Sequence, residues 1–366
     1  MDVTYLIGNG FDLGIGLKTS FSHFLKYYVK TPSTSEEIAN FKSTIENETT
    51  ELWADFEIAF GKYISNFSED DIERYVKIYN DVLDELNKYL VSESENFLDV
   101  LNNKIKEQIK IWIGLLKPRD IGLRPADYNR FLKITDYSNE RIDVTFHFLS
   151  FNYTEVFDKI VQTISDTCNG VLLSRSYNDG IRRRVIDNRI IHIHGKLNGN
   201  MIMGVNDEEQ LPFSGELLYR IKRRIIKPEK NKSIGYNTDS ISMNTIQKSN
   251  IICIYGMSMG ATDTIWWESI GKWLLTDNAT ALIYFVYDTN INNGTVHTID
   301  EILDSEAFYR DKLLEAIKIP IDKREAIQDR IFVIINSAFM QVNLTKNDND
   351  NLDANAIDDT QPLMNS

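Results

Sequence analysis

The sequence predicts an α/β protein with a mostly parallel sheet and a large helical insertion. Short apolar, β-branched runs alternate with segments of helical periodicity, and polar or glycine-rich turns follow several of these runs. In open α/β sheets, ligands bind outside the carboxyl ends of the strands. We therefore expect one α/β domain over residues 1–344, a helical insertion at about 35–140, and a disordered acidic tail at 345–366.

The first strand is expected at Val3–Ile7 and ends in the turn Gly8-Asn9-Gly10. Glycines leave room for a phosphate, and backbone N–H groups near a helix start favour an anion. A helix should follow Ser20, which is a good cap residue. The turn lacks the third glycine of a dinucleotide fingerprint and the lysine of a P-loop, so a tight structural corner is the alternative.

Composition limits the function classes. The chain has 366 residues, 42% of them hydrophobic, and a net charge of -14, which makes general nucleic-acid binding unlikely. Cys168 and Cys253 stand far apart, so the sequence supports neither a disulfide framework nor a zinc site. Because no secretion signal or 18-residue apolar run is present, we expect a cytoplasmic protein that does not cross a membrane.

Residues 35–118 show helical periodicity with few glycines or prolines, which predicts the insertion. A second strand is expected at 143–151, ending at Asn152. An asparagine there can bind a sugar hydroxyl or a water, because its amide both donates and accepts hydrogen bonds. The alternative is that Asn152 caps the helix expected at 155–164.

A third strand is expected at 189–197, after a solvated loop that contains Arg182 to Arg184. Strand alternation places His192 and His194 on one face. His194 is the better candidate for a general base, because imidazole titrates near neutral pH and Gly195 leaves backbone space beside it. Two hydrogen-bonded histidines in a sheet are the alternative. A metal site would need a third nearby ligand, and none is expected.

The remaining chain predicts a strand and turn at 201–207. The segment 217–232 is locally basic and predicts an amphipathic helix that ends before Pro228, with a basic face, Lys227 included, turned to solvent. An apolar strand at 251–255 leads into Gly256-Met257-Ser258-Met259-Gly260 and a tryptophan-rich helix. This turn has the spacing of a serine-hydrolase elbow, but only His297 follows it, so we interpret Ser258 as lining a ligand turn. Strands at 281–287 and 330–335 flank a helix at 299–317.

Four motifs, taken together and in order, resemble the bacteriophage abortive-infection AbiH family. They are Leu-Ile-Gly-Asn-Gly-Phe-Asp-Leu at 6–13, Ser-Phe-Asn-Tyr-Thr at 150–154, His-Ile-His-Gly at 192–195 and Tyr-Gly-Met-Ser-Met-Gly-Ala-Thr-Asp at 255–263. More remotely, the series is similar to the sirtuin-like NAD-binding domains of bacterial defence proteins, which implies a sirtuin-like, Rossmann-type fold. The first turn departs from the sirtuin pattern and zinc-module cysteines are missing, so protein deacetylation is not expected.

This resemblance implies roles for the matching residues. His194 and Asn152 would be catalytic, His194 as the base and Asn152 on the ribose side. The residues expected to bind NAD or a related nucleotide are Gly8, Asn9, Gly10, Asp12, Ser258 and Asp263.

Two functions follow from these roles. The first is an antiphage enzyme that hydrolyses NAD without a metal and depletes the infected cell. The second is a nucleotide-binding sensor or scaffold without turnover. A metal-dependent nuclease is a third and weaker idea. A phage or host protein could act as the trigger, and the chain could form a homo-oligomer.

Overall fold

The computed structural model describes residues 1–47, 55–98, 121–137, 139, 141–235, 237–291 and 297–337. Within these residues, the strands form one seven-stranded sheet in the order β3-β4-β2-β1-β5-β6-β7. The strands are β1 (Asp2–Ile7), β2 (Val144–Ser150), β3 (Val171–Tyr177), β4 (Gly180–His192), β5 (Ile251–Tyr255), β6 (Ala281–Val286) and β7 (Ile331–Ile335). The predicted tail at 345–366 lies outside the described residues.

Six neighbouring strands are parallel, and only the edge strand β3 runs antiparallel to its neighbour β4. The parallel strands follow the order β4-β2-β1-β5-β6-β7, which is the order of a doubly wound sheet. In the centre, Tyr5 of β1 pairs with Phe148 of β2 and with Cys253 of β5. The prediction of a mostly parallel α/β sheet is confirmed.

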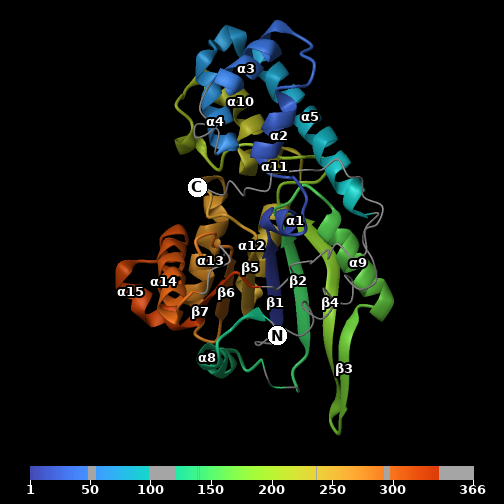
Figure 1. Ribbon diagram of the computed structural model, residues 1–366, viewed down its shortest axis with the longest axis vertical. Helices are drawn as coiled ribbons and strands as arrows, with labels where there is room; N and C mark the ends of the chain where they lie inside the picture. Colours follow the sequence, from blue (N-terminus) through green and yellow to red (C-terminus); the bar gives the residue numbers. More distant parts are fainter. Residues whose placement is uncertain are drawn as a thin grey trace.

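Helices cover both faces of the sheet (Figure 1). On one face, the apolar core formed with β1 and β2 includes Phe11 of α1 and Phe157 of α9. On the other face, Leu6 and Ile252 pack with Trp267 of α13. The helices of these two layers are α1 (Gly10–Gly14), α8 (Pro125–Thr135), α9 (Val156–Cys168), α12 (Thr238–Lys248), α13 (Thr264–Thr276), α14 (Ile299–Ala316) and α15 (Ile321–Ile327).

A helical lobe stands above the carboxyl edge of the sheet (Figure 1). It has its own aromatic core, in which Phe41, Phe60 and Tyr75 are fully or almost fully buried. The lobe comprises α2 (Phe21–Tyr28), α3 (Glu36–Asn47), α4 (Phe56–Tyr63), α5 (Ile72–Leu98) and α10 (Glu216–Ile225), with α11 (Lys227–Ser233) following α10 beneath it. The helix α8 also falls within the predicted insertion, but it packs against the sheet and contacts β6.

Local sequence explains several boundaries. The Ser20 side chain accepts a hydrogen bond from the His23 N–H and begins α2, as predicted. Thr298 and Glu301 form a reciprocal capping box at the start of α14. The amphipathic helix α10 ends at Ile225, and Pro228 stands in the first turn of α11, where a proline is tolerated.

Two local predictions are wrong. Arg182 to Arg184 do not form a loop: they belong to β4, which pairs with β3 in a hairpin at the edge of the sheet. An edge hairpin tolerates polar residues because much of its surface faces water. The strand expected at 201–207 is also missing there, and the segment forms only a single bridge, between Val205 and Ile226. Gly204 has φ +149 beside the Ile225 carbonyl, which breaks extended pairing.

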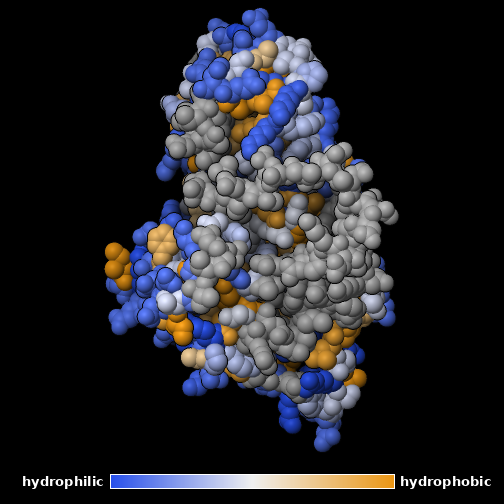
Figure 2. All heavy atoms as spheres, in the orientation of Figure 1, coloured by the Kyte–Doolittle hydropathy of each residue, from blue (hydrophilic) through white to orange (hydrophobic). Residues whose placement is uncertain are grey.

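The visible surface is mostly hydrophilic over the lobe, and apolar patches appear near α14 and α15 (Figure 2). The exposed side chains of this corner include Ile299, Phe308 and Ile321. None of the described helices is long and apolar enough to span a membrane. A homo-oligomer stays a prediction.

Candidate functional site

The predicted motifs meet at the carboxyl edge of the sheet. Gly8, Asn152 and His194 follow the ends of β1, β2 and β4, and Ser258 follows β5. These strands are parallel neighbours, so their carboxyl ends lie side by side. The strand order reverses next to β1, and doubly wound sheets bind ligands in the crevice at that point.

The first glycine turn packs against the turn after β5. The Gly8 N–H donates to the Tyr255 carbonyl over 2.9 Å, and the Gly10 N–H donates to the Gly256 carbonyl over 2.7 Å. A Cβ on Gly10 would lie 2.6 Å from the Gly256 Cα, so only glycine allows this approach. Both N–H groups are therefore already hydrogen-bonded to backbone in this conformation.

Asn9 and Asp12 connect this turn to neighbouring segments. The Asn9 Oδ1 accepts a hydrogen bond from the Thr19 hydroxyl over 2.7 Å, which ties the turn to the start of α2. Asp12 is fully buried and accepts hydrogen bonds from the Asn152 amide over 3.2 Å and from the Thr154 hydroxyl over 2.5 Å. Burial raises the pKa of Asp12 to about 7, although both hydrogen bonds oppose the rise.

Asn152 is fixed on both its amide and its backbone. Its Nδ2 donates to Asp12, whereas its buried Oδ1 has no hydrogen-bond partner among the described residues. Its backbone carbonyl lies 3.0 Å from the His192 Nδ1, and the His192 Nε2 lies 2.8 Å from Asp158. Burial lowers the pKa of His192, but the hydrogen bond and charge of Asp158 outweigh it and the net shift is upward. Both partners of the ring are oxygen acceptors, which favours an N–H on each ring nitrogen.

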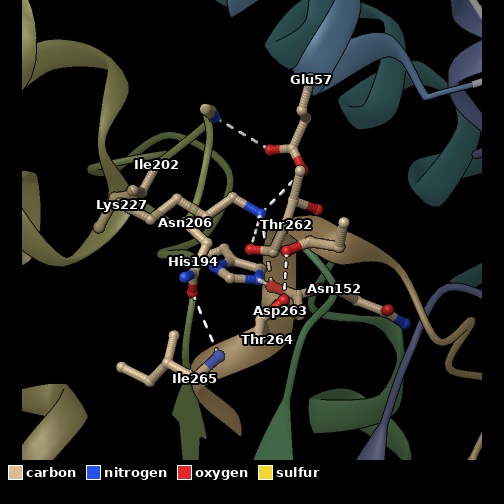
Figure 3. A network of polar contacts seen from close by, with 12 residues as sticks. Glu57, Asn152, His194, Ile202, Asn206, Lys227, Thr262, Asp263, Thr264 and Ile265 are labelled. Carbon is tan, nitrogen blue, oxygen red and sulfur yellow. Dashed lines mark hydrogen bonds and ion pairs between the residues drawn. The ribbon is translucent and has the colours of Figure 1, made fainter. Parts of the chain in front are cut away.

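His194 belongs to a different polar network (Figure 3). Its Nε2 lies 3.0 Å from the Asp263 Oδ1, and its buried Nδ1 has no partner among the described residues. Burial would raise the pKa of Asp263, but Lys227 and His194 outweigh it and hold that pKa well below its usual range. An ionised Asp263 can only accept, so in the neutral form of the His194 ring the proton lies on Nε2 and Nδ1 is an acceptor.

The two histidines do not share a face, contrary to the prediction. The strand β4 ends at His192, and the chain turns before Gly195, which has φ +70. His192 therefore contacts Asp158 of α9, whereas His194 contacts Asp263 at the start of α13. In Figure 3 the Asn152 amide also points away from the His194 ring. The two predicted catalytic side chains occupy one edge but belong to separate networks.

Lys227 and Glu57 complete the His194 network, and the sequence pattern did not identify either. Lys227 was predicted on a solvated basic face, but it is buried: its Nζ lies 2.7 Å from the Glu57 Oε2 and 3.4 Å from the Asp263 Oδ1. Glu57 comes from α4 of the lobe and also accepts the Gly204 N–H over 3.0 Å. This buried ion pair joins the helical lobe to the histidine. In the local sequence, only the apolar pair Ile225-Ile226 before Lys227 indicated that Lys227 is buried.

A small cavity lies beside His194, with a volume of about 10 Å³, which is room for about one water molecule. Ligand pockets typically span ~300–1,000 Å³, so this cavity admits no nucleotide in the present conformation. Its lining residues are Ile193, His194, Asn206, Lys227, Pro228, Asn231, Asp239, Thr262, Ile265 and Trp266. Sequence reasoning identified only His194 among its polar members as a site residue.

Ser258 is exposed in the turn after β5, and His297 instead lies 3.5 Å from Glu301 in α14. The parts of the chain that the structure describes contain no cluster of three or more histidine, cysteine, aspartate or glutamate side chains that could hold a metal ion.

The family model described as Bacteriophage abortive infection AbiH matches residues 4–285, which include every predicted site residue. No protein of curated function matches the chain.

Proposed function

The chain belongs to the bacteriophage abortive infection AbiH family, and from this premise we propose that it acts in phage defence by binding NAD or a related nucleotide and hydrolysing NAD. One observation carries the proposal. Asp263 holds the Nε2 of His194, so that the buried Nδ1 is an acceptor beside a cavity at the carboxyl edge of the sheet. The resemblance of the four motifs to sirtuin-like NAD-binding domains supports the choice of NAD.

The proposed reaction needs no metal. The oxygen of a water forms a bond to C1′ of the nicotinamide ribose, and the bond from C1′ to the pyridinium nitrogen breaks with its electron pair going to nicotinamide. The His194 Nδ1 takes the proton of the water, and ADP-ribose and nicotinamide leave. Asp263 acts as a positioning residue, because it fixes the tautomer of the base. The Asn152 Oδ1, on the side away from the His194 ring, would accept a hydrogen bond from a ribose hydroxyl.

A sensor or scaffold without turnover is the second candidate. Two observations favour it: the N–H groups of Gly8 and Gly10 are occupied by backbone carbonyls, and the cavity is small. A nucleotide would then bind only after the turns after β1 and β5 separate. In this case a phage or host protein would be the trigger that exposes the edge. Under either function we expect the protein in the cytoplasm, because NAD and the phage genome are both present there.

Product analysis separates the two candidates. Purified protein is incubated with NAD, NADP and mononucleotides, and the products are resolved by chromatography. We expect nicotinamide and ADP-ribose from NAD, and a rate that falls ~10² to 10⁴-fold in His194→Ala, as for loss of a general base. His297→Ala is the control, since His297 lies at Glu301, away from this network.

The outcomes are distinct. If His194→Ala hydrolyses NAD at the wild-type rate, the assignment of the base is wrong. If wild-type protein turns over no nucleotide but protects cells from phage, and His194→Ala does not protect them, the sensor is the better account.

A further inference from the structure

The hairpin of β3 and β4 projects from the amino edge of the sheet, at the end of the molecule away from the helical lobe (Figure 1). Val144, the first residue of β2, pairs with Arg184 of β4, so residues 180–183 extend beyond this parallel neighbour. They pair with residues 174–177 of β3, and the two segments form a two-stranded ribbon. Most side chains of this ribbon are exposed, and its tip is hydrophilic (Figure 2).

The ribbon is basic although the chain as a whole is acidic. Residues 171–184 contain four arginines and one acidic residue, Asp179, whereas the whole chain has 54 acidic residues and 40 lysines and arginines. Arg141 adds a further guanidinium, which lies over the Tyr177 ring at 5.7 Å from its centroid. At physiological salt, charges further apart than ~8 Å are largely screened. The acidic body of the protein therefore does not cancel the positive charge of the projecting ribbon.

The arginines point to both faces of the ribbon. Arg175 pairs directly with Arg182, so these two side chains share one face, whereas Arg183 pairs with Ser174 and lies on the other face. Arg175 and Arg183 are both exposed. Asp179 offsets part of the charge, at 3.2 Å from Arg182. Like charges directly opposite each other destabilise a pair of strands, so the arrangement of Arg175 and Arg182 favours binding of an anion.

A two-stranded ribbon with cations on both faces matches the major groove of B-form DNA. This groove is ~12 Å wide and admits a two-stranded β-ribbon. Phosphates border it on both sides, and the guanidinium of arginine binds a phosphate through two parallel hydrogen bonds. The major groove of an RNA duplex is too narrow to admit such a ribbon. An acidic protein surface would contact only one face of it.

We propose that the ribbon binds duplex DNA in the major groove, with Arg175 and Arg183 contacting phosphates on opposite sides of the groove. Such contacts position the ribbon and carry no sequence information, so the binding is not sequence-specific. This function is separate from the proposed hydrolysis of NAD, because the ribbon projects from the edge of the sheet opposite to His194.

The test measures how strongly a labelled short DNA duplex binds at different salt concentrations, by fluorescence anisotropy. Between about 50 and 200 mM salt, the logarithm of the wild-type affinity should fall with the logarithm of the salt concentration, by a slope of about 0.9 for each phosphate contact. Arg175→Gln/Arg183→Gln removes two contacts. Its slope should be smaller by about 2, and its Kd at about 100 mM salt should be about tenfold higher or more.

Arg220→Gln/Arg223→Gln is the matched control. It removes the same charge from two exposed arginines of α10, in the helical lobe, and should bind DNA like the wild-type protein. Arg175→Lys/Arg183→Lys keeps the charge of the ribbon and should bind within about threefold of the wild type. Circular dichroism checks that each variant is folded. If the glutamine pair does not fold, Arg183→Gln alone should reduce the slope by about 1.

The outcomes separate this proposal from its alternatives. It is wrong if the glutamine pair at Arg175 and Arg183 leaves the affinity and the salt slope unchanged, or if the control pair on α10 weakens binding as much. Equal binding of an RNA duplex or of polyglutamate would also overturn it, because the ribbon would then not recognise the groove of B-form DNA. NAD hydrolysis is measured on the same samples, and the glutamine pair should not change it.

Discussion

Replacement of Lys227 by methionine tests the buried network that supports His194. The variant keeps the apolar stem and removes an ammonium that lies 2.7 Å from Glu57 and 3.4 Å from Asp263. Two buried carboxylates, Glu57 and Asp263, then lose the ammonium that both of them contact. Breaking a buried ion pair by removing one partner typically costs about 3–5 kcal/mol, and we expect the free energy of unfolding to fall by this amount.

The assay is urea unfolding at pH 7, with the double variant Lys227→Met/Glu57→Gln beside the single one. The double variant should be more stable than the single variant, because it no longer buries one of the unpaired charges. Lys196→Met is the control: its exposed ion pair with Glu155, at 2.6 Å, should contribute about 0–1 kcal/mol.

The pH dependence gives an independent check. In the wild-type protein the lowered pKa of Asp263 contributes stability above its usual range near pH 4, and this contribution is lost only as the pH falls through the folded-state pKa. Without Lys227 the buried carboxylates should take up protons more readily, so the deficit of the variant should shrink from pH 8 to pH 5. A loss below about 1 kcal/mol at pH 7, or a deficit that grows toward acid pH, would refute the reasoning.

Three further outcomes are expected. Burial raises the folded-state pKa of Asp12 to about 7, so the native protein binds more protons than the unfolded chain between about pH 4 and 7. The free energy of unfolding therefore falls as the pH rises through this window. Asp12→Asn should reduce this pH dependence, as measured by unfolding curves at pH 5 and 8. Gly10→Ala should lower the free energy of unfolding by about 1–3 kcal/mol, because the added Cβ would lie 2.6 Å from the Gly256 backbone. Gly14→Ala is the control, since the nearest atom to its Cβ would be 3.6 Å away. Equal stability of the two variants in thermal unfolding would contradict the close-approach argument. Thr298→Ala should lose about 1 kcal/mol from the capping box of α14, with no change in nucleotide binding, as measured by urea unfolding and calorimetry.

The sequence by itself determined the parallel sheet and the position of its motifs. The runs at Val3–Ile7 and 251–255 are β-branched and apolar on both faces, which is the pattern of strands buried between helices. Because each motif follows such a strand, parallel pairing brings Gly8, Asn152 and His194 to one edge. This inference needs only local pattern and the direction of the strands.

The partners of each side chain were decided only by the tertiary structure. Local sequence could not show that Lys227 is buried between Glu57 and Asp263, because those residues lie 170 and 36 positions away along the chain. Nor could strand alternation place His194, since the turn after β4 changes the direction of its side chain. A hydrogen bond or ion pair depends on which segments the fold brings within about 3 Å, and periodicity carries no information about such long-range contacts.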